Sequence, residues 1–299
     1  MVGAAIARAL GAAGVDTVTE RVELLDREAL AAAFRGCDAV IHAAALYSYD
    51  APAATIMQVN VEGTRNVVHA CRSAGVGRLV YTSTAGTCGP VPGRPATEAD
   101  EPPPWYGRRV PYKQSKLEAE RIVLEAVRGG LDAVVVNPTT VLGEGDRRPT
   151  PTGRMVEQVA TGRIRAFVET AGLNVVDVRD VAAGHLLALE RGRPGERYLL
   201  GGVNWTLQQP FARIAAAAGI DAPTVRLPYG LARVAGALGV ANRQEVRLAR
   251  LPLFFSHDRA AAELGYAPAP PGAAIERAVA GALARRRQAV HLLPAPITQ

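Results

Sequence analysis

The stretch Asp38-Ala-Val-Ile-His-Ala-Ala-Ala45 indicates a short apolar strand that ends in three small residues. Small side chains at the carboxyl end of a strand let a ligand approach the backbone closely. In open α/β sheets, ligands bind at the edge where the strands end. The stretch therefore predicts one strand of a ligand-binding sheet, and the segments on either side of it show what kind of sheet this is.

Strand and helix patterns alternate on both sides of this stretch. In chain order we expect helix 2–12, strand 15–22, helix 26–34, strand 38–42, helix 52–74, strand 78–83, a helix from about 110 and strand 133–137. Such alternation is typical of a parallel sheet built from βαβ units. The loop between residues 85 and 110 is rich in glycine and proline, and a loop of that length inside a compact domain is usually functional.

The pattern changes after Gly143. We expect an irregular loop at 146–153, then a helix, strands at 166–168 and 174–178, a helix at 181–189, a strand at 198–200, and a mostly helical remainder with breaks at Pro210, Pro228 and Pro252. A tail at 293–299 is expected to be mobile. These patterns divide the chain into a main domain, 1–145, to which elements from about 174–192 return, and a smaller lobe, 146–299.

Composition excludes several classes of function. The net charge is +6, but the arginines are scattered, and the run Arg285-Arg-Arg287 is explained by a solvated helix end, so we expect no nucleic acid partner. Cys37, Cys71 and Cys88 lack metal-ligand spacing, and the histidines are dispersed, so we expect reduced thiols and no metal site.

The first ten residues, Met1 to Leu10, are apolar, but Arg8 lies inside the run and no basic leader precedes it. This pattern favours an amphipathic helix over a signal peptide. No stretch approaches the ~20 apolar residues of a membrane span, so we expect a cytoplasmic protein.

The segment Val110-Pro-Tyr-Lys-Gln-Ser-Lys-Leu-Glu-Ala-Glu120 carries the chemistry. Tyr112 and Lys116 are four residues apart on a helix-like pattern, which stacks their side chains on one face. A lysine ammonium beside a phenol favours the phenolate and lowers a pKa that is otherwise near ~10, which suits a general acid or base. Taken alone, the same spacing also occurs by chance on solvated helices.

Several motifs together resemble the extended short-chain dehydrogenase/reductase family, in its NAD(P)-dependent epimerase/dehydratase group. The motifs are Val40–Tyr47, Asn60–Thr64, Tyr81–Thr87, Tyr112 with Lys116, Asn137-Pro138, Val176–Ala182 and Leu264–Tyr266. Ala45–Ser48, Thr150–Gly153 and Gly184–Glu190 resemble more narrowly the hopanoid-associated sugar epimerases and dihydroflavonol-4-reductase-like proteins. The resemblance implies a Rossmann-type, doubly wound parallel sheet that binds the cofactor, with the smaller lobe binding substrate.

The resemblance also implies roles for individual residues. Tyr112 would be the general acid/base, Lys116 would lower its pKa and bond the nicotinamide ribose, and Thr84 would hold the substrate oxygen. Threonine suits this role because its hydroxyl both donates and accepts. The neighbouring Ser83 offers an adjacent hydroxyl for the same role, but a hydrogen-bonded serine at a strand end is the favoured interpretation. The implied reaction is hydride transfer between NAD or NADP and a carbinol or carbonyl carbon of a small molecule.

Further positions would surround the cofactor and the substrate. The implied cofactor contacts are Gly3, Glu23, Leu24, Ala43, Ala44, Ala45, Asn60, Pro138 and Thr139, beside Tyr112 and Lys116. The implied substrate contacts are Tyr47, Thr84, Ala85, Arg154 and Arg179. Asn60 could equally serve a structural bond that bends its helix, and either arginine could instead form a surface ion pair.

The chain departs from the family at its start. Gly3 matches the third glycine of the family's GxxGxxG fingerprint, while the first strand, the first two glycines and the second strand have no counterpart. The first two glycines form the turn that admits the phosphates. Glu23, with Leu24 after it, aligns where the family contacts adenine, and the strand that selects between NAD and NADP is missing.

Three functions remain open. The chain could be an NAD(P)-dependent reductase or epimerase of a sugar or hydroxylated small molecule. It could use Thr84, Tyr112 and Lys116 for acid/base chemistry without a cofactor, or it could be a non-catalytic binding protein. In the family, the helix from Pro52 and the helix carrying Tyr112 form the usual dimer face, so we expect a homodimer.

Overall fold

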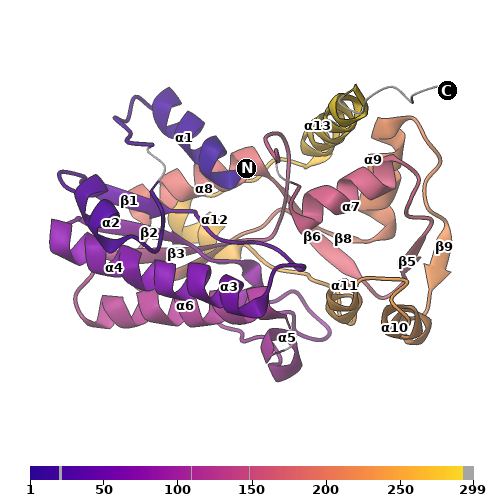
Figure 1. Cartoon of the computed structure of the whole chain (residues 1–299), viewed down its shortest axis with the longest axis horizontal. Coiled ribbons are helices and arrows are strands. Elements are labelled where there is room, and N and C mark those ends of the chain that lie inside the picture. The colour runs from indigo at the N-terminus through magenta and orange to yellow at the C-terminus, as the bar shows by residue number, and fades with distance from the viewer. Residues whose placement is uncertain (20–21, 109, 148, 292–299) are drawn as a thin grey trace, which may run out of the picture.

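A four-stranded parallel sheet organises the larger part of the molecule (Figure 1). The computed structural model describes residues 1–19, 22–108, 110–147 and 149–291. The strands follow the order β1-β2-β3-β7. They are β1 (Ala39–His42), β2 (Arg78–Thr82), β3 (Ala133–Pro138) and β7 (Arg197–Leu200). All three pairings are parallel, so every strand of this sheet ends at the same edge.

Alternate residues of the central strands face opposite sides of the sheet, as the two-residue period of a strand requires. Leu79 and Val135 join one buried cluster, whereas Val80 and Val134 join another. Because both faces are covered, these strands are apolar throughout, which is why their sequences form continuous runs rather than alternating ones.

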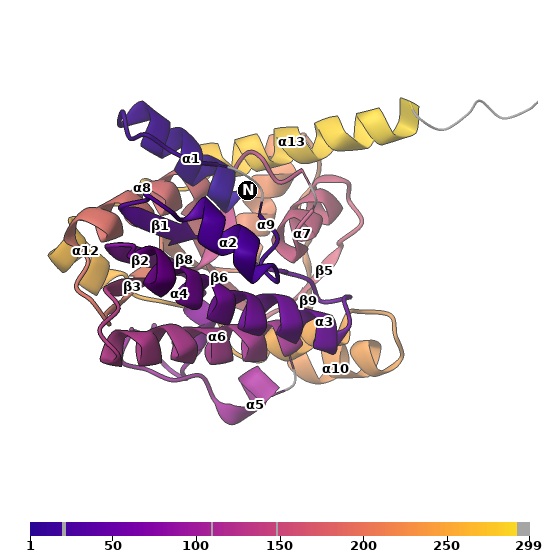
Figure 2. The same cartoon turned by 60° about the vertical axis from the view of Figure 1, so that its left-hand side comes forward.

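Helices cover both faces, which makes the fold doubly wound (Figures 1 and 2). On one face lie α2 (Arg27–Ala33), α4 (Gly63–Ala74) and α6 (Pro111–Arg128). On the other lie α8 (Val178–Arg191) and α12 (Asp258–Leu264). The first helix, α1 (Val2–Ala12), packs its apolar side, with Ile6 and Leu10, against α8.

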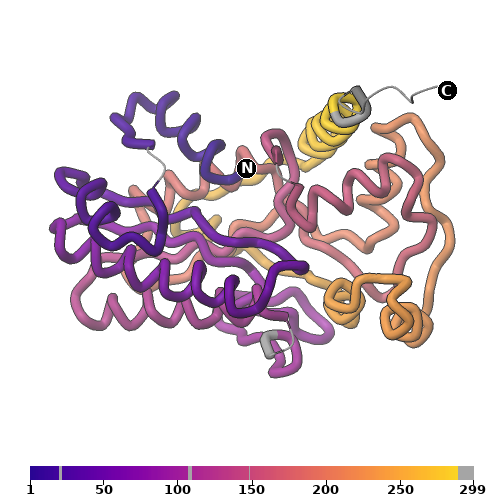
Figure 3. The backbone as a smooth tube through the Cα atoms, in the orientation of Figure 1, coloured from indigo at the N-terminus to yellow at the C-terminus, as the bar shows by residue number. Residues whose placement is uncertain are grey.

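A second part of the chain carries two small sheets. One has the order β4-β6-β8 and the other pairs β5 with β9. The strands are β4 (Thr140–Leu142), β5 (Ala166–Val168), β6 (Gly172–Asp177), β8 (Val203–Thr206) and β9 (Val225–Leu227). The helices are α7 (Pro151–Ala160), α9 (Gln208–Ala218), α10 (Tyr229–Ala237), α11 (Arg243–Leu248) and α13 (Gly272–His291). Helices α7, α9 and α13 enclose their own buried cluster, and α13 lies at the outside of the molecule (Figure 3).

Most predicted elements are confirmed, some with shifted ends. The helix predicted at 52–74 forms as three consecutive segments, α3 (Ala53–Met57), a π-helical turn η1 (Gln58–Glu62) and α4. The long loop contains a 3₁₀ turn, η2 (Ala85–Thr87), and a short helix, α5 (Pro104–Arg108). The residues of the tail predicted to be mobile, 293–299, lie outside the described residues.

Two predicted features are wrong. The described residues of 15–22 form no strand, because a strand needs a hydrogen-bonding neighbour and β1, next in the chain, pairs only with β2. Pro210 does not interrupt the C-terminal helices, since it lies in the first turn of α9, where the amide that proline lacks has no partner within the helix.

The smaller strands show what the sequence pattern missed. Strands β4, β8 and β9 were not predicted, and β6 pairs with β4 and β8 rather than joining the four-stranded sheet. Helix α8 and strand β7 do join the larger part, and the division at 145/146 stays a prediction.

Candidate active site

Helix α6 carries Tyr112 and Lys116 along the carboxyl-terminal edge of the sheet. Val110 is extended and Pro111 occupies the first turn, where its fixed φ favours the start of a helix. Both side chains are buried, Tyr112 at 8% exposure and Lys116 at 2%. The helical spacing therefore turns both residues inward, as the sequence predicts.

Lys116 is held by the end of β2. Its Nζ donates to the hydroxyl of Tyr81 at 2.8 Å and to the carbonyl oxygen of Thr82 at 2.6 Å, and it lies 4.4 Å from the centroid of the Tyr81 ring. Burial lowers the pKa of Lys116 to about 7, and the nearby Glu120 carboxylate opposes that shift. An ammonium has three donors, so one remains for another ligand.

Tyr112 is packed against a second phenol. Its ring centroid lies 4.4 Å from that of Tyr47. Burial, and to a smaller extent Tyr47, raises the pKa of Tyr112 above its ordinary value. The expectation that Lys116 lowers this pKa is wrong in this structure, because the Lys116 ammonium is bonded to the end of β2 and the phenol is buried. At neutral pH Tyr112 is therefore a neutral phenol that can donate a proton.

Thr84 follows the end of β2 and begins η2. Its Oγ1 accepts from the amide of Gly86 at 3.3 Å and from Nζ of Lys113 at 3.5 Å. The adjacent Ser83 Oγ is buried and has no hydrogen-bond partner among the described residues. The expectation of a hydrogen-bonded Ser83 is therefore wrong. An orphaned hydroxyl beside Thr84 is a polar group that a ligand at this edge could satisfy.

A buried polar network fixes the turn that carries Thr84 and Ala85, which is itself buried. Thr87 donates to Glu120 Oε2 at 2.7 Å, and Asn137 Nδ2 donates to the same carboxylate at 3.0 Å and to Thr87 Oγ1 at 2.9 Å. The other oxygen of Glu120 pairs with Arg197 at 3.2 Å. The network joins η2, α6, β3 and β7, so the position of Thr84 depends on four elements.

Sequence reasoning missed two polar residues of this site. Lys113 is 8% exposed, and its Nζ lies 5.6 Å from the ring centroids of both Tyr106 and Tyr112. Tyr106, from α5, is fully buried, and its hydroxyl has no partner among the described residues. One signal in the sequence could have found Lys113: among 34 lysines and arginines, only Lys113 and Lys116 are lysines.

Asn60 holds the segment that follows β1. Its Oδ1 accepts from the amide of Leu46 at 2.7 Å, and its Nδ2 donates to the carbonyl of Leu46 at 3.1 Å and to Ser115 Oγ at 2.9 Å. It lies in η1, and its own carbonyl accepts from Thr64 Oγ1 at 2.7 Å. These contacts favour the structural alternative, in which Asn60 positions Tyr47 from a distorted helix.

The other implied cofactor positions form two groups. Gly3, Glu23, Ala44 and Ala45 are exposed, and Leu24, Ala43 and Thr139 are half-buried. Pro138 is buried at the end of β3, and the Thr139 hydroxyl donates to Asn174 Oδ1 at 2.8 Å.

These positions fit the nicotinamide half of NAD(P) best. The spare donor of Lys116, the unsatisfied Ser83 hydroxyl and the exposed small residues after β1 are groups that could receive a nicotinamide and its ribose. At the phosphate half, the described chain supplies the N-terminus of α1, whose first amides have no side-chain cap.

The two arginines expected at the substrate both form surface ion pairs. Arg154 Nη2 lies 3.1 Å from Asp50, in the segment that follows Tyr47, and the carbonyl of Tyr49 accepts from Gln244 at 2.9 Å. The segment beside Tyr112 is thus tied to α7 and α11. Arg179, in contrast, is largely exposed and pairs with Glu144 at 3.0 Å.

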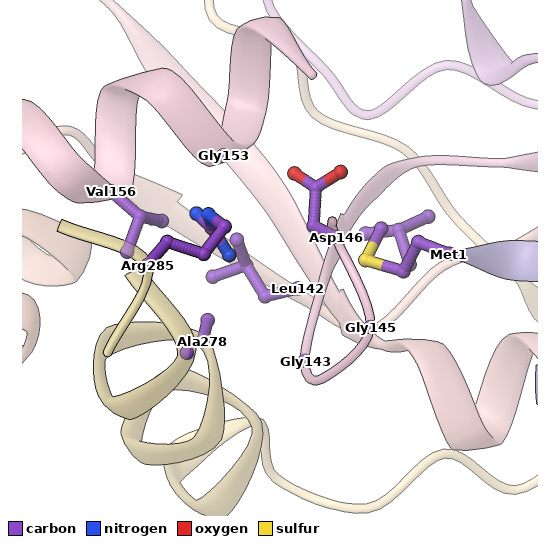
Figure 4. Close-up of a pocket in the computed structure, with 11 residues that line it drawn as sticks. Met1, Leu142, Gly143, Gly145, Asp146, Gly153, Val156, Ala278 and Arg285 are labelled. Atoms are coloured by element: carbon purple, nitrogen blue, oxygen red, sulfur yellow. The ribbon is translucent and has the colours of Figure 1, made fainter. Parts of the chain in front are cut away.

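A small pocket lies near the first residue (Figure 4). Its lining includes Met1, the loop from Gly143 to Asp146, and Arg285 of α13, but none of the predicted site residues that the structure describes. Asp146 accepts from the Thr150 hydroxyl at 2.9 Å, so its carboxylate serves the start of α7.

Comparison with known proteins agrees with this geometry. Residues 1–201 match the sequence profile of the NAD dependent epimerase/dehydratase family. The chain belongs to this family. It is an oxidoreductase/epimerase-type protein with an extended short-chain dehydrogenase/reductase fold, so the predicted fold class and family are confirmed.

Individual relatives of the family cover most of the chain. A Synechocystis protein of the dihydroflavonol 4-reductase type is 36% identical over 268 residues, or 83% of this chain and 76% of the relative. The 4-hydroxy-2-methyl-3-oxo-4-farnesyl-3,4-dihydroquinoline-1-oxide ketoreductase of Stigmatella aurantiaca is 34% identical over 81% of this chain and 76% of its own. A solved nucleoside-diphosphate-sugar epimerase from Pseudomonas aeruginosa has a TM-score of 0.79 and 29% identity, covering 95% of this chain and 94% of its own.

The described part of the chain also bears on the expectations about membranes and metals. Among the described residues, no helix combines the length and apolar character needed to cross a bilayer. The same residues contain no group of three or more histidine, cysteine, aspartate or glutamate side chains placed to hold a metal ion. The expected cytoplasmic location stays a prediction.

Proposed function

We propose that this protein is an NAD(P)-dependent reductase that converts a ketone of a small molecule to a secondary alcohol, with Tyr112 as the proton donor. The observation that carries the proposal is the burial of the Tyr112 phenol on the same helix as Lys116, with Lys113 Nζ 5.6 Å from the Tyr112 ring centroid and 3.5 Å from Thr84 Oγ1. The bound nicotinamide would supply the hydride. The residues of the chain position the carbonyl and supply the proton.

The protonation state of Tyr112 supports the reductive direction. A ketone that accepts a hydride becomes an alkoxide, which must receive a proton. Burial raises the pKa of Tyr112, so the phenol carries its proton at neutral pH, and it can give that proton to the alkoxide because an alkoxide is the stronger base. Thr84 would hold the oxygen of the carbonyl through its hydroxyl, which faces the Lys113 ammonium.

Lys116 would orient the cofactor. Two of its three donors bind the Tyr81 hydroxyl and the Thr82 carbonyl, which fixes the direction of the third. We assign that donor to a hydroxyl of the nicotinamide ribose. Ser83, whose hydroxyl has no partner among the described residues, would supply a second polar contact at the same end of the cofactor.

The names of the relatives support a reductase with an organic substrate. The Synechocystis relative is of a reductase type, and the Stigmatella relative is a ketoreductase of a farnesylated heterocycle. We therefore favour a hydroxylated, partly apolar small molecule, such as a terpenoid or polyketide-like compound, over a nucleotide sugar as the substrate of this chain.

The direct test is titration of the purified chain with NADH and NADPH, followed by nucleotide fluorescence. We expect saturable binding of at least one of them, and Tyr112→Phe to keep that binding while lowering ketone reduction by about 10²- to 10⁴-fold.

No saturable signal with either nucleotide would count against the proposal. Turnover that persists without nucleotide but falls in Tyr112→Phe would favour cofactor-free acid/base chemistry. Unchanged function in Tyr112→Phe and Lys116→Ala would favour a binding protein.

A further inference from the structure

The ammonium of Lys113 is buried without an acidic partner among the residues that the structure describes. Its side chain is 8% exposed, and its polar contact is with the hydroxyl oxygen of Thr84 at 3.5 Å, the outer limit of a hydrogen bond. The two aromatic rings near it, of Tyr106 and Tyr112, each lie 5.6 Å from Nζ. A buried cation without a counterion is costly, so its retention needs an explanation.

Lysine is not a surface residue in this protein. The chain has 34 lysines and arginines, yet only Lys113 and Lys116 are lysines, and both are buried on α6. Arginines supply the surface cations, as in the exposed pairs of Arg193 with Glu263 and Arg94 with Asp100. A compact ammonium is therefore used only at this site, where one lysine is assigned to the cofactor and the other has no assigned role.

The groups around Lys113 are donors rather than acidic acceptors. The Tyr106 hydroxyl is fully buried and has no hydrogen-bond partner among the described residues, so it too can bind an acceptor. Gly86 lets the ammonium approach the backbone, because a Cβ at that position would lie 2.5 Å from Nζ. The Lys113 ammonium and the Thr84 hydroxyl lie 3.5 Å apart, and the ring of Tyr106 lies 5.6 Å from the ammonium, so these groups together suit an anion.

We infer that Lys113 binds a carboxylate of the substrate, and that the substrate is a 2-oxo or 3-oxo acid reduced to the corresponding hydroxy acid. This inference rests on the proposed function, which assigns the reacting oxygen to Thr84. Lys113 Nζ lies 3.5 Å from Thr84 Oγ1, so an oxygen held by Thr84 is next to the ammonium. A carboxylate one or two carbons from the reacting carbon can therefore contact Lys113 while its oxo group contacts Thr84.

The environment of Lys113 makes it responsive to such a ligand. Burial lowers the pKa of Lys113 to about 8, and no nearby carboxylate opposes that shift. A bound carboxylate favours the ammonium and raises the pKa, whereas an uncharged ester does not. Lys116 differs, because Glu120 already opposes the effect of burial there.

The presence of only two lysines allows a direct measurement on the full chain. Labelling with ¹³Cε-lysine gives one NMR signal from each, and Lys113→Arg removes one of them and so assigns both. The probes are 3-hydroxyoctanoate and its methyl ester, each added to protein saturated with the nucleotide that binds. We expect the acid to raise the pKa of Lys113 by about one unit or more, and to bind at least about tenfold more tightly than the ester.

Variants separate this inference from the proposed function. Lys113→Met should abolish the preference for the acid, Lys113→Arg should restore part of it, and the remote charge-removal control Arg193→Gln should keep it. If neither NADH nor NADPH binds, the proposed function is overturned, and the carboxylate inference is then tested by comparing the acid with the ester on the chain without nucleotide. Nucleotide binding with no acid-induced rise in the pKa of Lys113, or with equal affinity for acid and ester, would overturn the carboxylate inference alone. The comparison of the affinities for the acid and the ester uses the unmodified chain, so it does not depend on the folding of a variant.

Discussion

At the scale of single residues, the burial of Lys113 and Lys116 links the site to the stability of the fold. Burial lowers their pKa values to about 8 and about 7, whereas a lysine in an unfolded chain titrates near ~10.4. Between these values the unfolded chain binds more protons than the folded one. The unfolding free energy must therefore rise with pH in that range.

We predict that the free energy of unfolding increases by roughly 2 kcal/mol between about pH 7 and about pH 9, as the buried lysines lose their protons in the folded state. The lysines alone would add roughly 3.5 kcal/mol, but burial raises the pKa values of Cys71 and Cys88 to about 12, so the unfolded thiols, which titrate near ~8.5, ionise first and offset part of the gain from about pH 8 upward. Denaturant unfolding at several pH values measures the slope.

The rise of the unfolding free energy with pH should depend on the two lysines. Lys116→Met removes the larger shift and should abolish most of the gain, whereas Arg193→Gln, which alters an exposed ion pair, should leave it unchanged. A stability that is flat or falls from pH 7 to pH 9 in the unmodified chain would contradict the prediction.

Sequence spacing placed Tyr112 and Lys116 on one buried face of a helix, since that follows from helical geometry alone. It could not show that Lys116 Nζ would bond Tyr81, which lies 35 residues away in the chain. The predicted lowering of the pKa of Tyr112 by Lys116 was wrong for the same reason. A pKa depends on burial and on the partners of a charge, and these depend on tertiary packing.

At the scale of elements, the π-helical turn η1 connects the segment that follows β1 to helix α6. Asn60 of η1 binds both backbone groups of Leu46 and the hydroxyl of Ser115 on α6. This positions the segment that carries Tyr47, whose ring packs on Tyr112. A π-helical turn inside a helix is often found at a functional site.

Replacing Asn60 should loosen that segment. We predict that Asn60→Ala lowers the unfolding free energy by about 2 to 4 kcal/mol, because it leaves the half-buried amide and carbonyl of Leu46 and the buried Ser115 hydroxyl without this partner. Amide exchange should accelerate at residues 46–50 more than in β3. The matched control is Asn66→Ala, which removes an amide of the same chemistry that bonds Leu24 and Arg27 instead.

If residues 46–50 exchange no faster in Asn60→Ala than in Asn66→Ala, Asn60 does not hold that segment. A further comparison is nucleotide affinity, which should change little in Asn60→Ala, since its contacts are with the chain itself.

The elements that the sequence predicted well are those with continuous apolar runs, such as β3 with Val134, Val135 and Val136. A strand with such a run is buried on both faces of a parallel sheet, so it can be recognised from its sequence without knowing which strands lie beside it. The residues at 15–22 carry an alternating pattern but have no strand beside them in the described chain. Alternation shows that a strand could form, while pairing decides whether it does.

At the scale of the whole molecule, resemblance to a family predicted more than periodicity could. The doubly wound sheet and its family are confirmed, while the small sheets of the second part were missed in part because each strand there has only three to six residues. Short strands give too few alternations to be distinguished from loops.

The assembly of the molecule is the remaining prediction at this scale. Helices α3, α4 and α6 lie side by side on one face of the sheet, away from α8 and α12 (Figure 1). The outer side of α6 carries Arg121 and Glu125, both exposed, with the half-buried Leu117 one turn after Lys113. A two-fold partner would bring a second copy of these helices against the first and form a four-helix contact.

We predict a homodimer through this face, with twice the chain mass of 31.4 kDa by light scattering at micromolar concentration. Leu117→Glu should shift the protein toward the monomer, because it places a charge at the centre of the contact. Leu231→Glu, the same change at an exposed leucine of α10, should leave the dimer intact. A monomeric mass for the unmodified chain would refute the assembly, and dissociation by Leu231→Glu but not Leu117→Glu would move the contact to α10. Since α6 also carries Tyr112 and Lys116, a dimer through α6 would fix both active sites to a shared layer of helices. The monomeric Leu117→Glu variant should then have a lower reductase activity than the dimer.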